Sequence, residues 1–242
     1  VTDLTLGGGI NRYDGDHFGK ILWMQNAGPY YPGYEWYRNR GVKDEINMYG
    51  KAATEITSSL SSYIDLQLRY ISYSIKGPDD DRRDITQAHY FTFFNPKAGL
   101  FWRNGSGSEA YASVAVAHRE PTRSDFTDAS GDASATPRAE RMTDFETGYS
   151  FASAPLSFNV KFYYMYYHDQ LVPTGQISNV GYSIMTNVNR SYRTGVELSS
   201  TFRPSHNIGI NANVTLSRNK IADFINYYTE YNTSDWSSSY TH

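Results

Sequence analysis

The sequence lacks cysteine, long apolar runs and a surplus of one charge. Without cysteine it has no disulfide, no thiolate nucleophile and no thiolate metal ligand. The longest uncharged apolar run, around Ala112 to Ala117, is far shorter than the roughly twenty residues that a membrane helix needs. A formal net charge of -3 offers no basic surface for nucleic acid. These absences exclude a membrane protein built from helices and a nucleic-acid-binding protein.

Aromatic residues are abundant although aliphatic residues are not. The chain has 22 Tyr and 12 Phe, yet only 39% of its residues are hydrophobic. Transmembrane β-barrels combine a wet lumen with aromatic girdles at both membrane interfaces, and this composition fits them. A carbohydrate-binding β-sandwich fits it as well, so composition alone leaves both classes open.

Three segments between Asp144 and Ala222 alternate apolar and polar residues with a period of two, which predicts β-strands. In Leu156 to Asp169, for example, Phe158, Val160 and Phe162 share one face. These segments run to a dozen residues or more, whereas strands of soluble sandwiches usually have about five or six. One apolar face over roughly nine to eleven residues is the length of strand that crosses a bilayer.

The same pattern over the whole chain predicts an all-β fold, an antiparallel meander of about nine long strands forming part of a transmembrane β-barrel. Predicted connections alternate between short turns and long loops, as in outer-membrane barrels. Nine is an odd number for such a barrel, so we expect residues 1–242 to be an incomplete barrel domain. The predicted strands are 2–13, 45–57, 62–76, 86–103, 109–119, 140–153, 156–169, 190–203 and 207–222, with long loops at 14–44, 120–139 and 171–189 and an aperiodic tail at 226–242.

Six short motifs lie along this pattern between about Tyr90 and Phe224. They are Asn95-Pro96-Lys97-Ala98-Gly99-Leu100, Tyr111-Ala112-Ser113, Arg119-Glu120-Pro121-Thr122-Arg123, Asp144-Phe145-Glu146-Thr147-Gly148-Tyr149, Tyr192-Arg193-Thr194-Gly195-Val196-Glu197-Leu198 and Asn219-Lys220-Ile221-Ala222-Asp223-Phe224. In this order and spacing they resemble the C-terminal half of TonB-dependent outer-membrane receptors. The order and spacing are more specific than any one motif.

The resemblance implies a receptor in the outer membrane of a Gram-negative bacterium, surrounded by outer-membrane lipid. Such receptors are barrels of about 22 strands with an N-terminal plug domain. They bind a scarce ligand outside the cell and import it with energy from the inner-membrane TonB complex, which acts through the plug. The resemblance therefore implies a small-molecule, metal-chelate, saccharide or peptide ligand and no nucleic acid. No plug domain is expected within this sequence.

A dense aromatic group in the first long loop is the leading ligand-binding candidate. It comprises Tyr30, Tyr31, Tyr34, Trp36 and Tyr37, punctuated by proline and glycine. Aromatic faces stack on ligands at low entropic cost. Anchoring at the membrane interface is the alternative role of such residues. The proline and glycine punctuation indicates a shaped loop.

Other candidates are fewer. Arg119 and Arg123 suit an anionic ligand, or else pair with lipopolysaccharide phosphates or with Asp125. The six histidines are scattered without metal-ligand spacing, and no serine lies in a Gly-x-Ser-x-Gly turn, so we expect neither an enzyme nor a metal or cofactor site. The charged run Asp79 to Arg83 predicts a solvated loop rather than a calcium site, because its arginines offset the carboxylates.

The alternative to a receptor is a soluble β-sandwich ligand-binding module, or an adhesin fragment, with aromatic loops. Charge on the apolar face discriminates the two classes. A Lys or Arg at the bilayer midplane of a barrel costs about 2–4 kcal/mol. No charged residue occupies the middle of the apolar faces assigned above, which favours the barrel.

Overall fold

The computed structural model describes residues 1–26, 28–128, 136–177, 183–222, 224, 228–231 and 238–241. The chain divides into two compact units. One contains Val1–Thr5, Gly50–Leu66 and Phe94–His242. The other contains Leu6–Tyr49 and Gln67–Phe93, so the first four strands contribute to both units.

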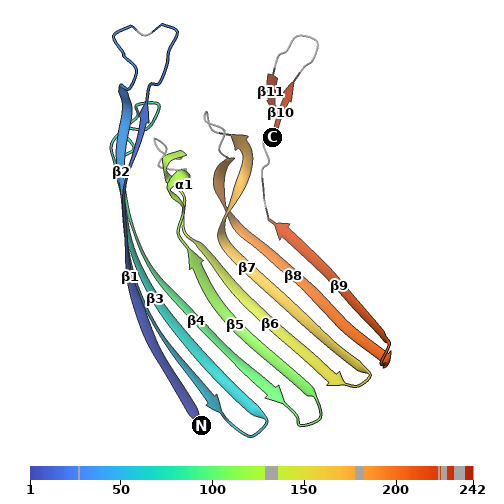
Figure 1. Cartoon of the computed structure of the whole chain (residues 1–242). Coiled ribbons are helices and arrows are strands. Elements are labelled where there is room, and N and C mark those ends of the chain that lie inside the picture. The colour runs from blue at the N-terminus through green and yellow to red at the C-terminus, as the bar shows by residue number, and fades with distance from the viewer. Residues whose placement is uncertain are drawn as a thin grey trace. The chain divides into compact units, whose positions relative to one another are not determined.

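Nine of the described strands form one sheet in the order β1-β2-β3-β4-β5-β6-β7-β8-β9, with each strand beside its sequence neighbour (Figure 1). This topology confirms the predicted nine-stranded antiparallel meander. β10 and β11 form a separate two-stranded sheet. The elements are β1 Thr2–Lys20, β2 Glu35–Glu55, β3 Leu60–Lys76, β4 Gln87–Arg103, β5 Ser108–Arg119, α1 Arg123–Asp128, β6 Glu140–Ser153, β7 Leu156–Ile177, β8 Ser183–Ser205, β9 Ile208–Ile221, β10 Tyr228–Tyr231 and β11 Ser238–Thr241.

Strand register places the apolar positions of neighbouring strands directly opposite one another. In β7 and β8, for example, Phe162 is the register partner of Val196, and both side chains are partly exposed. Exposed apolar side chains on one face of a sheet are what a lipid-facing surface requires. One continuous row of partners crosses six strands and consists of Leu100, Ala112, Thr147, Phe162, Val196 and Leu216.

The opposite face of the same strands is polar and includes directly paired charges. Lys161 on β7 is the register partner of Glu197 on β8, one residue before the Phe162 and Val196 pair in β7. Because side chains alternate along a strand, these charges lie on the face away from the apolar row. The nine strands therefore have one lipid-compatible face and one hydrophilic face, as the lumen of a barrel requires.

Tyrosines on the hydrophilic face lie across glycines of the neighbouring strand. A Cβ atom on Gly99 would lie 2.6 Å from Tyr63 Cε1, and one on Gly195 would lie 2.6 Å from the hydroxyl oxygen of Tyr163. Tyr111 covers Gly148 in the same manner, and these two residues are register partners. Glycine at these positions permits the close approach of an aromatic ring. The side chain of any larger residue would collide with that ring.

Two predicted loops are wrong in large part, because the strands beside them are longer than the sequence pattern indicated. Residues 14–20 and 35–44 of the first predicted loop belong to β1 and β2, and residues 171–177 and 183–189 of the third belong to β7 and β8. Residues 178–182 lie outside the described residues. Past the membrane both faces of a strand carry polar groups, so the strand continues without alternating hydrophobicity.

The predicted loop 120–139 contains the helix α1 among its described residues. Thr122 caps this helix, since its Oγ1 accepts from the Asp125 backbone N–H at 3.4 Å and its own backbone N–H donates to Asp125 Oδ2 at 2.7 Å. Phe126 is 1% exposed and is one of the buried apolar residues of the chain, as are Leu171 and Val188. Residues 129–135, and most of the predicted tail 226–242, lie outside the described residues. None of the helices in the described ranges is long and apolar enough to cross a membrane.

The single meander also decides against the sandwich alternative. A β-sandwich packs two sheets face to face, commonly with Greek-key connections. Here β1 to β9 follow sequence order in one sheet, and among the described strands only β10 and β11 lie outside it.

Candidate functional site

The predicted aromatic group lies where the β1–β2 hairpin reverses. The strand pairing continues past Lys20, because the backbone N–H of Ile21 donates to the Tyr34 carbonyl at 2.9 Å and that of Gly33 to the Ile21 carbonyl at 2.7 Å. A turn bond from the Tyr34 N–H to the Tyr31 carbonyl, at 3.0 Å, fixes the returning chain. The aromatic residues are thus held on a hairpin rather than on a free loop.

Four of the five predicted aromatic residues contact one another. Tyr30 lies with its ring centre 5.0 Å from Tyr34 and 5.6 Å from Trp36, and Tyr31 meets Tyr34 edge-on at 5.7 Å. Tilted and edge-to-face pairs at these distances are favourable. We call Tyr30, Tyr31, Tyr34 and Trp36 the aromatic cluster. Tyr37 is not part of it, since its ring lies across Gly19 of β1.

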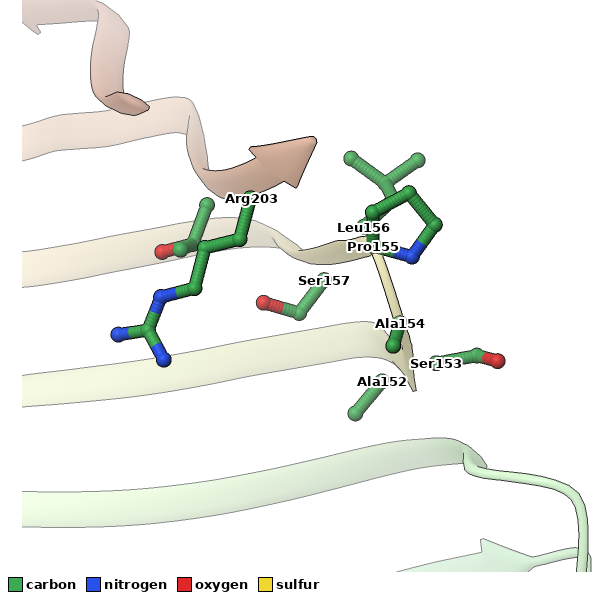
Figure 2. A pocket seen from close by; sticks show the side chains of 8 residues that line it. Ala152, Ser153, Ala154, Pro155, Leu156, Ser157 and Arg203 are labelled. Carbon is green, nitrogen blue, oxygen red and sulfur yellow. The ribbon is translucent and has the colours of Figure 1, made fainter. Parts of the chain in front are cut away.

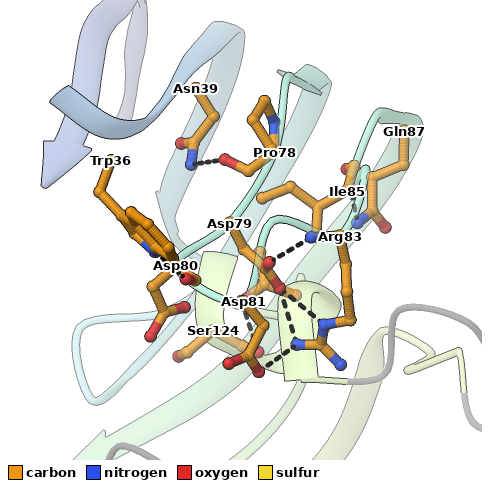
Figure 3. Close-up of polar contacts among 11 residues, drawn as sticks. Trp36, Asn39, Pro78, Asp79, Asp80, Asp81, Arg83, Ile85, Gln87 and Ser124 are labelled. Carbon is orange, nitrogen blue, oxygen red and sulfur yellow. Dashed lines mark hydrogen bonds and ion pairs between the residues drawn. The ribbon is translucent and has the colours of Figure 1, made fainter. Parts of the chain in front are cut away.

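The loop between β3 and β4, residues 77–86, is bonded to the aromatic cluster and to β2 (Figure 3). Trp36 Nε1 donates to the Asp80 carbonyl oxygen at 2.7 Å, and the Arg82 guanidinium carbon lies 4.7 Å from the Trp36 ring centre. Asn39, which is 2% exposed, donates from Nδ2 to the Pro78 carbonyl at 2.8 Å. Sequence reasoning missed this loop, because no local signal connects residues 44 positions apart.

Ion pairs close loop 77–86. Asp80 to Arg83 are exposed, as expected of a solvated charged run, whereas Asp79 is buried. Asp79 is only 7% exposed, and its Oδ2 accepts from Arg83 Nε at 2.9 Å while its Oδ1 accepts from the Arg83 backbone N–H at 2.8 Å. The hydrogen bond to Asp79 raises the pKa of Arg83. Hydrogen bonds donated by the Thr86 hydroxyl and backbone N–H lower the pKa of Asp84.

Charged pairs lie on the β1–β2 hairpin, between the aromatic cluster at its end and the apolar segments of the two strands. Arg40 and Asp14 lie 2.6 Å apart, and Arg38 lies 2.7 Å from Asp16 and 2.6 Å from Glu35. All five are outside the apolar segment of their strands, which includes the exposed Leu4, Leu6 and Ile10 on β1 and Ile46 and Met48 on β2. The ion pairs begin beyond Ile10 on β1 and lie before Ile46 on β2, and paired charge of this kind is not expected on a lipid-facing surface.

The two predicted arginines lie in the other unit and have different surroundings. Arg119 forms a two-pronged ion pair with Glu140, with Nε and Nη2 at 2.8 and 2.9 Å from the two carboxylate oxygens. Its side chain nevertheless remains 58% exposed. Arg123 is the first residue of α1. The structure thus shows Arg119 already paired within the protein.

Sequence reasoning also missed a polar network that connects β7, β8 and the segment just before β6. Asn187 accepts from the Arg138 backbone N–H at 2.7 Å and donates to the Asp169 carbonyl at 2.6 Å, while Arg138 Nη2 donates to Asp169 Oδ1 at 2.6 Å. Ser191 donates to Gln170 Oε1 at 2.5 Å in a buried position. These residues lie within β7 and β8 and just before β6, and among them Asn187 falls in the predicted loop 171–189.

A pocket of about 420 Å³ lies beside the short turn between β6 and β7 (Figure 2). Arg203, Ser157 and Thr201 contribute its polar lining, and Pro155 and Leu156 contribute apolar groups. Within the described ranges, no group of three or more His, Asp or Glu is placed to hold a metal ion.

Solved structures similar to this chain share its fold. The copper transporter OprC superposes with a TM-score of 0.71 at 17% identity, over 91% of this chain and 36% of OprC. The ferric-catecholate import receptor Fiu from K12 E. coli gives 0.65 at 14%, over 98% of this chain and 37% of Fiu. The FrpB iron transporter from Neisseria meningitidis gives 0.55 at 20%, over 75% and 26%. The chain therefore spans between about a quarter and two fifths of these proteins.

Comparison of the sequence with known proteins has one positive and one negative result. No curated protein sequence matches the chain. The family model of the TonB dependent receptor-like β-barrel matches residues 2–241. The motifs, the meander and this match agree, and the chain belongs to the TonB-dependent receptors, which are outer-membrane proteins of Gram-negative bacteria.

Proposed function

We propose that the chain is the part of an outer-membrane receptor that presents a ligand-binding surface outside the cell, and that the whole receptor imports the ligand with energy from the TonB system. Energy would be transmitted through a plug domain of the kind that this family carries. Membership of a receptor family supports the proposal. The same membership supports a receptor without catalytic activity.

The observation that carries the proposal is the aromatic cluster on a hairpin much longer than a membrane requires. β1 has 19 residues and β2 has 21, whereas about 9–11 residues of strand cross a bilayer. The short turns of outer-membrane barrels lie on the periplasmic side. The long connection between β1 and β2 therefore lies outside the cell, together with the aromatic cluster.

We propose a metal chelate with aromatic or planar faces as the ligand class. The tyrosine rings offer flat, polarisable faces to such a molecule. Several similar structures are named as transporters or receptors of iron or iron chelates, including FrpB, Fiu and the ferric yersiniabactin uptake receptor FyuA from Yersinia pestis. Arg119 and Arg123 are proposed as separate contacts for an anionic ligand.

Binding isotherms on the intact receptor test this proposal. The probes are the iron(III) complex of 2,3-dihydroxybenzoate, ferric deferoxamine and Cu²⁺ without a chelator. We expect the first probe to bind tightest, and Tyr34→Ala to cost about 1–3 kcal/mol of binding free energy, by analogy with base stacking on aromatics. Tyr90→Ala is the control, since Tyr90 is also a tyrosine, is 67% exposed and lies outside the cluster.

Two outcomes would contradict the proposal. Equal affinities of the wild type, Tyr34→Ala and Tyr90→Ala would leave the cluster with an anchoring role only. Uptake of the iron-55 complex that continues after the proton-motive force is collapsed would exclude import driven by the TonB system. Heat-modifiable gel mobility checks that each variant forms its barrel.

A further inference from the structure

Loop 77–86 occupies the groups through which Trp36 could bind a ligand. An indole offers one N–H donor and its aromatic faces. The N–H of Trp36 is bonded to the Asp80 carbonyl, and the Arg82 guanidinium lies near its ring centre at the distance of a cation–π contact. Tyr30 meets the ring nearly at right angles. Trp36 is therefore engaged on several sides by the protein itself, and its contact with Asp80 can be followed in Figure 3.

The loop is fixed to β2 independently of Trp36. Asn39 holds the Pro78 carbonyl, and Gly77 lies so close to β2 that a Cβ atom on it would be 2.6 Å from the Arg38 carbonyl oxygen. At the other end of the loop, Ile85 is 1% exposed and donates its backbone N–H to the Gly77 carbonyl at 3.1 Å. Anchors at both ends make the loop a firm support for the Trp36 ring.

The tyrosines of the cluster are placed differently. Tyr30 contacts both Trp36 and Tyr34, and Tyr31 packs edge-on against Tyr34 while remaining 63% exposed. An aromatic surface therefore extends outward from Trp36 through Tyr30 and Tyr34 to Tyr31. Tyr31 is the exposed member of the cluster, whereas Tyr30, Tyr34 and Trp36 are half-buried.

We infer that Trp36 is a positioning residue, that Arg82 and Asp80 of loop 77–86 fix its ring, and that Tyr30, Tyr31 and Tyr34 are the residues that contact a planar aromatic ligand. The ligand contact rests on the proposed function. The coupling of loop 77–86 to the hairpin tip, residues 28–36, does not. The loop and the hairpin tip then move as one body, although they come from different parts of the sequence.

Hydrogen exchange on the intact receptor without ligand tests the coupling. We expect Arg82→Gln to accelerate amide exchange in both 77–86 and 28–36, because it removes the cation from the Trp36 ring. Arg82→Lys keeps a cation and should remain close to the wild type. Lys20→Gln is the matched control, since Lys20 lies 5.3 Å from the Phe18 ring centre on the same hairpin, outside the cluster. Faster exchange confined to 77–86, or an equal effect of Lys20→Gln, would overturn the inference.

Affinity for the iron(III) complex of 2,3-dihydroxybenzoate tests the division of roles. Arg82→Gln should weaken binding about two- to fivefold, the loss expected for one exposed cation–π contact, and Arg82→Lys should restore most of it. Trp36→Phe, which keeps a ring but loses the N–H, should bind better than Tyr34→Ala. The reverse order would overturn the assignment of Trp36 as a positioning residue. If the wild type does not bind the probe, the proposed ligand class fails, while the exchange result still decides the coupling.

Discussion

Arg119 and Glu140 are direct register partners across β5 and β6, and their side chains form a two-pronged ion pair. Glu140 makes a second contact, since its Oε1 also accepts a hydrogen bond from the backbone N–H of Leu171 on β7. One carboxylate therefore joins three neighbouring strands, β5, β6 and β7. The contact on β7 lies just beyond the apolar part of that strand.

Glu140→Ala should destabilise the receptor by about 1–3 kcal/mol, because it leaves the Leu171 N–H and the Arg119 guanidinium without their acceptor. Urea unfolding of the intact receptor in lipid vesicles measures this loss. Glu55→Ala, at an exposed carboxylate near the end of β2, should change the unfolding free energy little. Equal effects of the two variants would show that Glu140 has no special structural role.

An arginine on the apolar face should be far more costly than one on the polar face of the same strand. We expect Val196→Arg to cost about 2–4 kcal/mol and Ser199→Arg to cost much less, because Val196 is paired with Phe162 and Leu216 while Ser199 is paired with Asn159 and Asn213. Vesicle refolding measures both values. A larger penalty for Ser199→Arg would mean that the lipid-facing and lumenal faces have been exchanged.

Loop 77–86 should loosen in acid. The pKa of Asp84 lies below its ordinary value of 3.8 because Thr86 donates two hydrogen bonds to it. A lowered folded-state pKa gives stabilisation that is complete above the unfolded value and is lost as pH falls through the folded value. Pepsin cleavage of the loop, followed from about pH 5 to about pH 2, should rise at the acid end.

Asp84→Asn is the control for this titration. The variant has no carboxyl group at position 84, so its cleavage should rise less at the acid end than that of the wild type. Cleavage at the exposed turn 104–107 corrects for the pH dependence of the protease. A wild-type loop whose corrected cleavage stays constant over the range would contradict the prediction.

The strands of the lipid-facing region could be predicted because water and lipid impose opposite demands on their two faces. Phe158, Val160 and Phe162 alternate with polar residues, so the period is visible in the sequence. The extensions could not be predicted in this manner. Arg38 and Arg40 share their face with Asp14 and Asp16 across the hairpin, and such pairing leaves no apolar alternation to detect.

The candidate site was predictable to a similar degree. The aromatic group could be predicted because five aromatic residues lie within eight positions of the sequence. Four of these five residues contact one another. The separation of Tyr37 depends on Gly19, and the engagement of Trp36 depends on Asp80 and Arg82. Those partners are distant in sequence, and only the pairing of strands brings them near.

The glycines beneath Tyr63, Tyr111 and Tyr163 have a consequence for how relatives of this protein diverge. A larger residue at Gly148 has no space while Tyr111 lies across it, and a small residue at Tyr111 would leave Gly148 uncovered. Neither position can change alone without loss, so we expect each pair to be inherited and replaced together. Tyrosine and glycine on neighbouring strands should therefore covary among homologous barrels, and such covariation would mark which strands are adjacent from aligned sequences alone.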